Sequence, residues 1–287
     1  MNAGKQLIYY VIAPDPGGRL PRQWAQSLRS LRRFNPEIAV HLLHCGEVSR
    51  QIQEESDRNK VMVHQLPEYF DLLEKYAPGL DSLRSFPTLH KFLCLDRLPL
   101  DNVDQLLYLD CDTYWFADPA LLFQRYRTDH FYACAEVGSR AFGNWYDPAY
   151  LDEDQVAALS SALGLAVVPP FNTGVMLMHT VMCSRLLALR PWFLATAARL
   201  LAGSSVAQAA GAGSLAALPY PSSNTWLLDE VALWLSLGAI PGLQMGLFAQ
   251  NEVPISNLHA VLPAEDRLVA HYFSIQEDDF FRLFPRL

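Results

Sequence analysis

The sequence lacks the cysteine patterns that mark disulfide-rich proteins and zinc sites. No C-x-x-C pair occurs in its 287 residues, and the cysteines are odd in number and scattered: Cys45, Cys94, Cys111, Cys134 and Cys183. Disulfide frameworks and structural zinc sites need paired cysteines at characteristic spacings. We therefore expect buried free thiols in a reducing compartment, which predicts a cytoplasmic protein.

Long apolar segments are also missing. The first apolar run, Leu7 to Ala13, is too short to span a membrane and stops at Pro14-Asp15-Pro16-Gly17. It has neither the length nor the small-residue cleavage pattern of a secretory signal. We expect no transmembrane segment and interpret this run as the first strand.

Basic residues are outnumbered by acidic ones. The chain has 22 Lys and Arg against 30 Asp and Glu, which gives a formal net charge of -8. Domains that bind nucleic acid or anionic membranes carry basic clusters, so we expect no nucleic-acid partner. The apolar tail, Phe280 to Leu287, leaves peripheral membrane association as an alternative to packing against its own domain.

The remaining composition is that of a globular α/β protein, with 51% hydrophobic residues. Strand-like and helix-like segments alternate in the first part of the chain, which predicts a doubly wound, mostly parallel sheet flanked by helices. The predicted strands there are Leu7 to Ala13, Ile38 to His44 and Val61 to Leu66; a helix carries Trp24, Leu28, Leu31 and Phe34, and Gln51 to Asn59 is a helix or a loop.

The later elements follow the same two periodicities. We predict strands over Gln105 to Asp112, Phe131 to Glu136 and Phe171 to His179. We predict helices over Leu89 to Leu98, Phe193 to Leu201 and Asp229 to Leu237. Between the last two, residues 203–213 are rich in Ala, Gly and Ser, which is typical of a flexible surface segment.

Two aspartates end the predicted strand that contains Leu106 to Leu109. Asp110 and Asp112 are two residues apart, and in extended chain such side chains point the same way. Their oxygens suit Mg²⁺ or Mn²⁺, which in proteins often also bind substrate phosphates. The alternative is that they merely terminate a strand. The metal is favoured, because paired carboxylates beside apolar chain repel each other unless a cation joins them.

The stretch Leu107-Tyr108-Leu109-Asp110-Cys111-Asp112-Thr113 resembles the metal-binding Asp-x-Asp motif of GT-A glycosyltransferases, and of glycosyltransferase family 8 in particular. Other segments resemble that family in the same order along the chain. They are Tyr9 to Ala13 with Asp15, Ser27-Leu28-Arg29-Ser30-Leu31, Phe171-Asn172-Thr173-Gly174-Val175-Met176-Leu177-Met178, Leu228-Asp229-Glu230 and Ala270-His271-Tyr272-Phe273.

This resemblance implies a role for each matching position. Asp110, Asp112 and His271 would hold Mn²⁺ or Mg²⁺, with Cys111 in the same nucleotide-sugar-binding segment. The other implied roles are nucleotide contact for Ala13 and Asp15, the diphosphate or sugar for Lys91, the donor sugar or acceptor for Glu136, Asn172 and Thr173, and the reacting sugar for Asp229 and Glu230. The chain departs from the family after Tyr272, where the usual Gly and Lys are replaced by Phe273-Ser274-Ile275-Gln276-Glu277-Asp278.

The implied protein is a GT-A-like, Rossmann-like single domain over residues 1–287. Residues 1–136 would bind nucleotide and metal, and residues 137–287 would form the acceptor side, with residues 203–213 as a lid. The implied reaction moves a sugar from a nucleotide-diphosphate donor, UDP-linked by resemblance, to a hydroxyl of a glycan, lipid-linked or protein acceptor. Such a reaction belongs to glycan or polysaccharide biosynthesis. The family likeness implies retention at the anomeric carbon; if the reaction inverts, Asp229 or Glu230 is the candidate base.

Other interpretations of these residues remain open. Asp110-Cys111-Asp112 also fits the start of a haloacid-dehalogenase-like phosphatase motif, although Tyr114 stands where that motif needs a small residue. A nucleotidyltransferase needs a Gly-rich loop that the first turn matches poorly, and a nucleotide-sugar-binding protein without turnover would keep the same fold. Without the resemblance, each of these residues also has an ordinary structural interpretation. His271 could be a core histidine, Lys91 a surface lysine and Glu136 the end of a strand. Asp229 and Glu230 could be favourable charges at a helix N-terminus.

Overall fold

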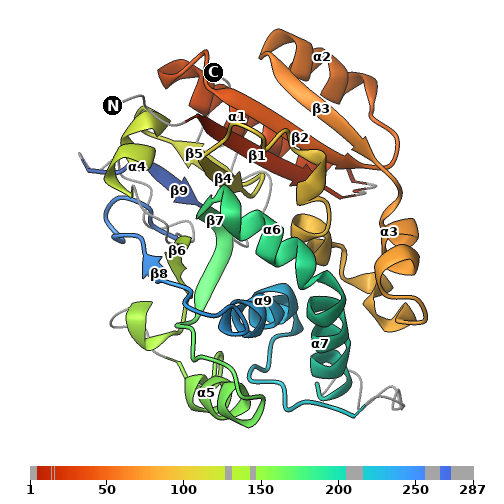
Figure 1. Cartoon of the computed structure of the whole chain (residues 1–287). Helices are drawn as coiled ribbons and strands as arrows, with labels where there is room; N and C mark the ends of the chain where they lie inside the picture. The colour runs from red at the N-terminus through yellow and green to blue at the C-terminus, as the bar shows by residue number, and fades with distance from the viewer. Residues whose placement is uncertain are drawn as a thin grey trace.

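A seven-stranded sheet forms the centre of the computed structural model, which describes residues 5–13, 15, 17–126, 131–142, 147–204, 216–255 and 266–272, without the side chains of Ser85 and Pro87. The strand order is β3-β2-β1-β4-β7-β6-β8 (Figure 1). The strands are β1 (Gln6–Ile12), β2 (Ala39–Cys45), β3 (Val61–Leu66), β4 (Gln105–Leu109), β6 (Phe131–Ala135), β7 (Phe171–His179) and β8 (Met245–Leu247).

Most neighbouring strands of this sheet are parallel. β3, β2, β1 and β4 run in one direction, β7 runs antiparallel to both β4 and β6, and β6 is parallel to β8. The side chains of β1 after Gln6 are all buried, as expected for a continuous apolar run covered on both faces. The mixed, mostly parallel sheet predicted from the sequence is therefore confirmed.

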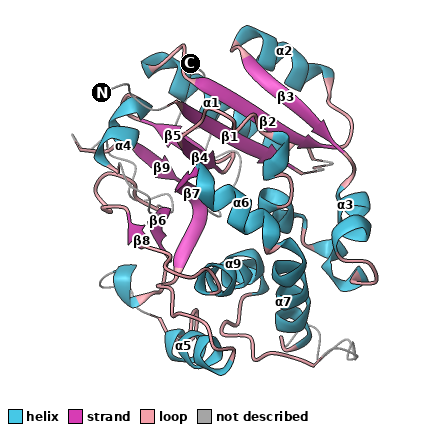
Figure 2. Ribbon diagram, viewed as in Figure 1, coloured by secondary structure: helices cyan, strands magenta, loops and turns pink. Residues whose placement is uncertain are grey.

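Helices cover both faces of the sheet (Figure 2). Two separate apolar cores fill the two spaces between sheet and helices. One face packs against α1 (Arg19–Phe34), α2 (Arg50–Arg58) and α4 (Pro119–Arg125). The other packs against α3 (Tyr69–Tyr76), α5 (Glu153–Ala162), α6 (Thr180–Ala188), α7 (Arg190–Ala202) and α9 (Leu228–Gly238).

A small second sheet joins two distant parts of the chain. β5 (Thr113–Trp115) pairs antiparallel with β9 (Val269–His271), and in this register Thr113 lies opposite His271. Since Thr113 directly follows Asp112, this pairing brings His271 beside the turn that carries both aspartates. The late histidine therefore reaches the carboxyl end of β4 through backbone pairing.

Two predicted elements differ from the structure. Leu89 to Leu98 is not one α-helix but the 3₁₀ turns η2 (Pro87–Phe92) and η3 (Leu95–Arg97), which follow η1 (Asp81–Ser85). Every residue from Leu89 to Leu95 is buried, so the apolar run has no periodicity that would identify the helix type. The strand predicted to reach Asp112 ends at Leu109, because the chain turns at Cys111 and Asp112 to enter β5.

The structure also bears on the predictions about thiols, membranes and mobile segments. All five cysteines are buried free thiols, as predicted. None of the helices in the described ranges has the length and apolar content needed to cross a membrane. Residues 205–213 of the predicted lid and the tail 280–287 lie outside the described residues, and Gly203 and Ser204 directly follow α7.

Candidate metal centre and its polar network

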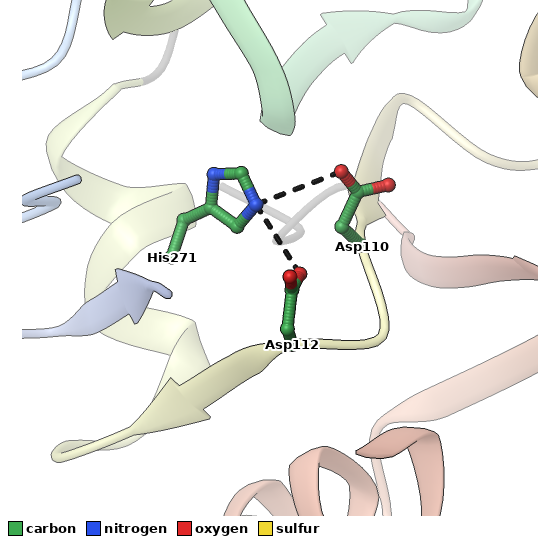
Figure 3. Close-up of side chains that lie close together, drawn as sticks. All are labelled: Asp110, Asp112 and His271. Atoms are coloured by element: carbon green, nitrogen blue, oxygen red, sulfur yellow. Dashed lines mark ion pairs between the residues drawn. The ribbon is translucent and has the colours of Figure 1, made fainter. Parts of the chain in front are cut away.

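Three potential metal ligands converge at the carboxyl end of β4. The Nε2 atom of His271 lies 3.2 Å from Oδ1 of Asp112 and 3.6 Å from Oδ2 of Asp110 (Figure 3). One ligand atom from each of these residues can be chosen so that all lie within 4.8 Å of one another. The spacing predicted that Asp110 and Asp112 lie together, and the family resemblance added His271; the two aspartates converge through a turn and not through extended chain.

This donor set fits a small divalent cation. Mg²⁺ binds its ligands at about 2.0–2.1 Å in octahedral geometry, so neighbouring ligand atoms stand roughly 3 Å apart. The two measured separations at His271 are close to that value. Carboxylate oxygens with one imidazole nitrogen suit Mn²⁺ and Mg²⁺ better than a soft metal. The ring is buried, which opposes its positive charge, yet Asp112 and Asp110 raise the pKa of His271.

Gly174 of β7 makes room for the imidazole. A methyl group placed on Gly174 would lie 2.2 Å from Cε1 and Nδ1 of His271, far inside van der Waals contact. The carbonyl oxygen of Gly174 also accepts a hydrogen bond from the amide of Asp110 at 2.8 Å. Gly174 therefore positions both an aspartate and the histidine. The sequence analysis quoted Gly174 within a motif but gave it no role.

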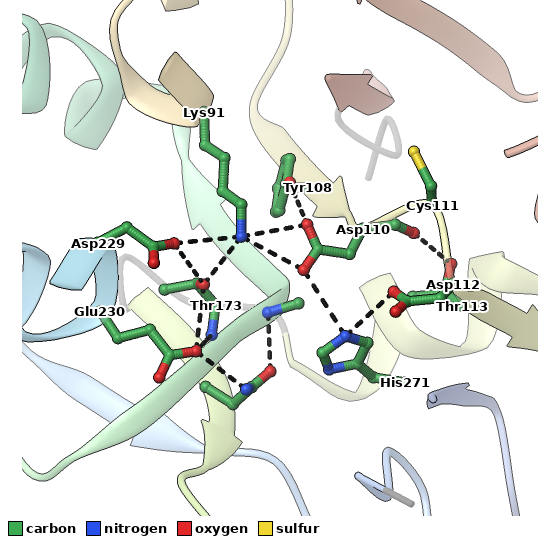
Figure 4. Close-up of polar contacts among 12 residues, drawn as sticks. Lys91, Tyr108, Asp110, Cys111, Asp112, Thr113, Thr173, Asp229, Glu230 and His271 are labelled. Atoms are coloured by element: carbon green, nitrogen blue, oxygen red, sulfur yellow. Dashed lines mark hydrogen bonds and ion pairs between the residues drawn. The ribbon is translucent and has the colours of Figure 1, made fainter. Parts of the chain in front are cut away.

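Lys91 lies among the carboxylates and not on the surface. It comes from η2, its side chain is 10% exposed, and its Nζ lies 3.2 Å from Oδ1 of Asp110 and 3.3 Å from Oδ2 of Asp229 (Figure 4). It also donates to Oγ1 of Thr173 at 3.2 Å. Burial opposes its charge, but Asp110, Asp229 and Glu230 outweigh burial and raise the pKa of Lys91. The interpretation of Lys91 as an ordinary surface lysine is therefore wrong.

The strand β7 and the helix α9 meet next to this lysine. Oε1 of Glu230 accepts hydrogen bonds from Nδ2 of Asn172 at 3.0 Å and from the amide of Thr173 at 3.2 Å. The hydroxyl of Thr173 lies 3.3 Å from Oδ2 of Asp229. Asp229 and Glu230 stand in the first turn of α9 but are buried, so they are part of this network and not solvent-exposed helix-end charges.

Glu136 and Glu230 form a buried carboxyl pair. Glu136 follows β6 and accepts a hydrogen bond from the amide of Val137 at 2.9 Å. Burial raises the pKa of Glu136 to about 7. Burial, followed by the charges of Glu136 and Asp229, also raises the pKa of Glu230 well above its usual range. A proton on one of the two groups keeps the pair from carrying two charges.

The side chains of the site carry a net negative charge. With one proton on the glutamate pair, negative charges remain on Asp110, Asp112, Asp229 and that pair. Lys91 and His271, whose pKa Asp112 and Asp110 raise, supply positive charge against them. The carboxylates still outnumber the cationic side chains, and carboxylates this close together repel one another, so the site suits a divalent cation.

Tyr108 and Cys111 both lie close to the aspartates, but only the side chain of Tyr108 contacts one of them. Tyr108, which the sequence analysis missed, donates its hydroxyl hydrogen bond to Oδ1 of Asp110. The i, i+2 rule that related the two aspartates also relates Tyr108 to Asp110 and could have found it. The side chain of Cys111 faces the core, where Sγ lies 3.9 Å from the carbonyl oxygen of Val11, so only its backbone is available to a ligand.

Ala13 and Asp15 line a separate cavity of about 370 Å³ beside the carboxyl ends of β1 and β2. His44, Glu47 and Glu68 line it as well. The carboxylate of Asp15 accepts hydrogen bonds from the amides of Gly17 at 3.2 Å and Leu20 at 2.6 Å. Asp15 thus anchors the start of α1, and the cavity lies where open α/β sheets bind ligands.

No protein-family model matches the chain, and no curated protein matches its sequence. Solved structures match its fold over nearly the full length. Apo mouse xyloside xylosyltransferase 1 matches with a TM-score of 0.54 and 15% identity over 94% of this chain and 98% of its own. The galactosyltransferase LgtC, in complex with donor and acceptor sugar analogs, matches with a TM-score of 0.51 and 15% identity over 97% and 94%. The bifunctional glycosyltransferase WbbM, as an apo structure, matches with a TM-score of 0.52 and 10% identity over 100% of this chain and 50% of its own.

These similarities show that the chain has the GT-A glycosyltransferase fold, as the sequence resemblance implied. At such low identities the likeness is one of fold. The chemistry follows from the side chains gathered around Asp110.

Proposed function

We propose that this protein is a metal-dependent glycosyltransferase that moves a sugar from a nucleotide-diphosphate donor to an acceptor hydroxyl. One observation carries the proposal: Asp110, Asp112 and His271 present a compact set of potential metal ligands, two carboxylates and an imidazole, at the carboxyl end of a central strand. In open α/β sheets this is the edge where ligands bind. The fold shared with solved glycosyltransferases supports the same conclusion.

Each part of the network has a role in this proposal. A divalent cation, Mn²⁺ or Mg²⁺, held by Asp110, Asp112 and His271 supplies charge stabilisation for a diphosphate leaving group. Lys91 holds its positive charge next to Asp110 and limits the repulsion between the site and that anion. Asp229 and Glu230 face the donor sugar from the opposite side of Lys91, where Asn172 and Thr173 hold Glu230 in place.

The donor is proposed to be a UDP-sugar. The family resemblance supports UDP, and the cavity beside Ala13 and Asp15 offers space for a nucleoside next to the metal-binding strand. Residues 1–136 would hold the nucleotide and metal and residues 137–287 the acceptor, within a single domain. The buried free thiols support a reducing, cytoplasmic location.

Several classes of acceptor suit the proposed reaction. A glycan, a lipid-linked saccharide or a protein hydroxyl would each serve the same chemistry. The haloacid-dehalogenase-like phosphatase is no longer a strong alternative, because the fold of the chain matches glycosyltransferases. A nucleotide-sugar-binding protein without turnover shares this fold and is the alternative that experiments must separate.

Thermal unfolding tests the binding half of the proposal. The melting temperature is measured with UDP, GDP, CDP and dTDP, each with and without Mn²⁺, for the wild type and Asp110→Ala. A ligand that binds only the native state raises the free energy of unfolding by about 2.7 kcal/mol at a concentration a hundredfold above its Kd, and the melting temperature rises with it. We expect a rise with UDP that requires Mn²⁺ and is absent in the variant. No rise with any nucleotide would contradict the proposal.

A further inference from the structure

Trp226 is a large apolar side chain that the fold leaves in solvent. It is 75% exposed, whereas Trp24, Trp115 and Trp234 are buried. A tryptophan side chain can bury about 150–250 Å² of surface, so its exposure forgoes a large stabilising contribution. Single exposed apolar residues are ordinary on protein surfaces. The position of Trp226 on the fold is what gives its exposure a meaning.

Trp226 lies one turn before the buried carboxylates. It belongs to η5 (Thr225–Leu227), a 3₁₀ turn that runs directly into α9. Leu227, at the junction, has φ -81° and ψ 9°, so the chain is not a regular α-helix there. Asp229 and Glu230 are three and four residues after Trp226, in the first turn of α9. The indole therefore marks the exposed end of a short segment whose other end is buried among the site residues.

Hydrogen bonds hold the backbone under this tryptophan. Oδ1 of Asn224 accepts from the amide of Trp226 at 3.0 Å, and the carbonyl oxygen of Asn224 accepts from the hydroxyl of Tyr220 at 3.0 Å. Ser222 and Ser223 donate to the carbonyl oxygens of Tyr150 at 2.6 Å and Ala149 at 3.0 Å, respectively. The tryptophan thus projects from an anchored turn.

Tyr150 connects that turn to the carboxyl pair. Its side chain is hydrogen-bonded with Asn224 and is near enough to Glu136 and Glu230 for their charges to add to burial in raising its pKa. Gly138, two residues after Glu136, has φ +81°, and a methyl group there would lie 2.8 Å from the Tyr150 ring. The two segments are therefore packed closely together. The anchored turn that carries Trp226 is thus linked through Tyr150 to the buried carboxyl pair.

We propose that Trp226 stacks against a sugar ring of the acceptor, which makes the acceptor a carbohydrate. One face of a pyranose presents C–H groups with slight positive charge, and these complement the negative face of an indole ring. The hydroxyls around the ring edge remain free for polar partners such as Tyr150 and Asn224. The proposal rests on the proposed function, since it takes Asp229 and Glu230 to mark the reaction centre.

Saccharide binding without donor tests this inference on its own. Lactose, cellobiose, maltose and xylobiose are titrated into the protein and followed by saturation-transfer NMR, with sorbitol as a polyol without a ring face. We expect saturable binding of at least one disaccharide, at least tenfold weaker binding in Trp226→Ala, and partial recovery in Trp226→Tyr. Phe70→Ala is the matched control, because Phe70 is an exposed aromatic on α3 at 53% exposure. We expect this control to bind like the wild type.

The outcomes separate the inference from the proposed function. Absence of saturable binding for all the disaccharides, or equal binding by Trp226→Ala and the wild type, overturns the role of Trp226. Transfer kinetics with the disaccharide that binds give a second readout. The acceptor KM of Trp226→Ala is expected to rise about tenfold relative to the donor KM. If none of the UDP-sugars binds, the proposed function is refuted, whatever the saccharide titration shows.

Discussion

Replacing Glu230 with glutamine tests the buried carboxyl pair. The amide oxygen of Gln can accept the hydrogen bonds that Asn172 and Thr173 now donate to Oε1 of Glu230. Its NH₂ group can donate to a carboxylate oxygen of Glu136. The variant therefore keeps the shape and the hydrogen bonds of the site but removes one titrating group.

The pKa of Glu136 gives the scale of the pH dependence that a buried carboxyl of this pair brings. Glu230→Gln removes the contribution of Glu230 and keeps that of Glu136. The pKa of Glu136 rises from 4.5 in an ordinary glutamate to about 7 in the fold, because of burial. A raised pKa contributes stability below the unfolded value and loses it as the pH rises through the folded value. The free energy of unfolding of the wild type should therefore fall by about 3 kcal/mol as the pH rises through this window. Glu230, whose pKa is also raised, contributes in the same direction.

Urea unfolding at a series of pH values measures this slope. The protein is kept in a chelator, so that bound metal does not contribute to stability. We expect Glu230→Gln to gain stability relative to the wild type as the pH rises through 7. Glu55→Gln is the control: burial opposes the charge of Glu55, but Arg29 outweighs burial and lowers its pKa. That variant should lose stability relative to the wild type at neutral pH and approach it in acid.

Parallel pH profiles for Glu230→Gln and the wild type would refute the reasoning. Such a result would mean that the fold does not raise the pKa of Glu230. A profile with the opposite slope would show that both carboxylates are charged and are paired with cations.

Further variants test other parts of the site. Asp112→Asn should bind Mn²⁺ at least tenfold more weakly and reduce transfer about 10²-fold or more, as measured by calorimetry and nucleotide release. Gly174→Ala should weaken Mn²⁺ binding about 10–100-fold, because the new methyl group displaces the imidazole of His271; unchanged affinity would show that the ring is not a ligand. Lys91→Met should lower the stability of the metal-free protein by about 3–5 kcal/mol, because it leaves the buried Asp229 and the partly exposed Asp110 without their cation. Lys91→Arg should recover part of that loss, and equal unfolding midpoints for Lys91→Met and the wild type would contradict this account.

The elements with strong local patterns could be predicted from the sequence. β7 is predicted with its true bounds, and β4 with its true start, although the predicted strand continues to Asp112 and the observed one ends at Leu109. The aspartates after β4 are recognisable because charge directly after a buried strand is unusual. The other site residues, Lys91 and His271 among them, lie on separate elements, and only the family resemblance pointed to them.

The rest depended on contacts between distant residues. The short strands β5 and β9 have three residues each, and each exists only through pairing with the other. No local sequence pattern predicts strands this short. The 3₁₀ turns before β4 were mistaken for a helix because their residues are buried on every side. The roles of Gly174 and Tyr150 come from close packing, which no spacing rule expresses.

Metal-dependent release of nucleoside diphosphate is the most direct test of the proposed function. The protein is incubated with UDP-glucose, UDP-galactose and UDP-xylose, with Mn²⁺ or with a chelator, and released UDP is quantified for the wild type and Asp112→Ala. The proposal predicts that UDP is released from at least one donor, that release requires Mn²⁺, and that it is abolished in Asp112→Ala. Release that is unaffected by the chelator and by Asp112→Ala, or no release from any donor by protein that binds Mn²⁺, would contradict it.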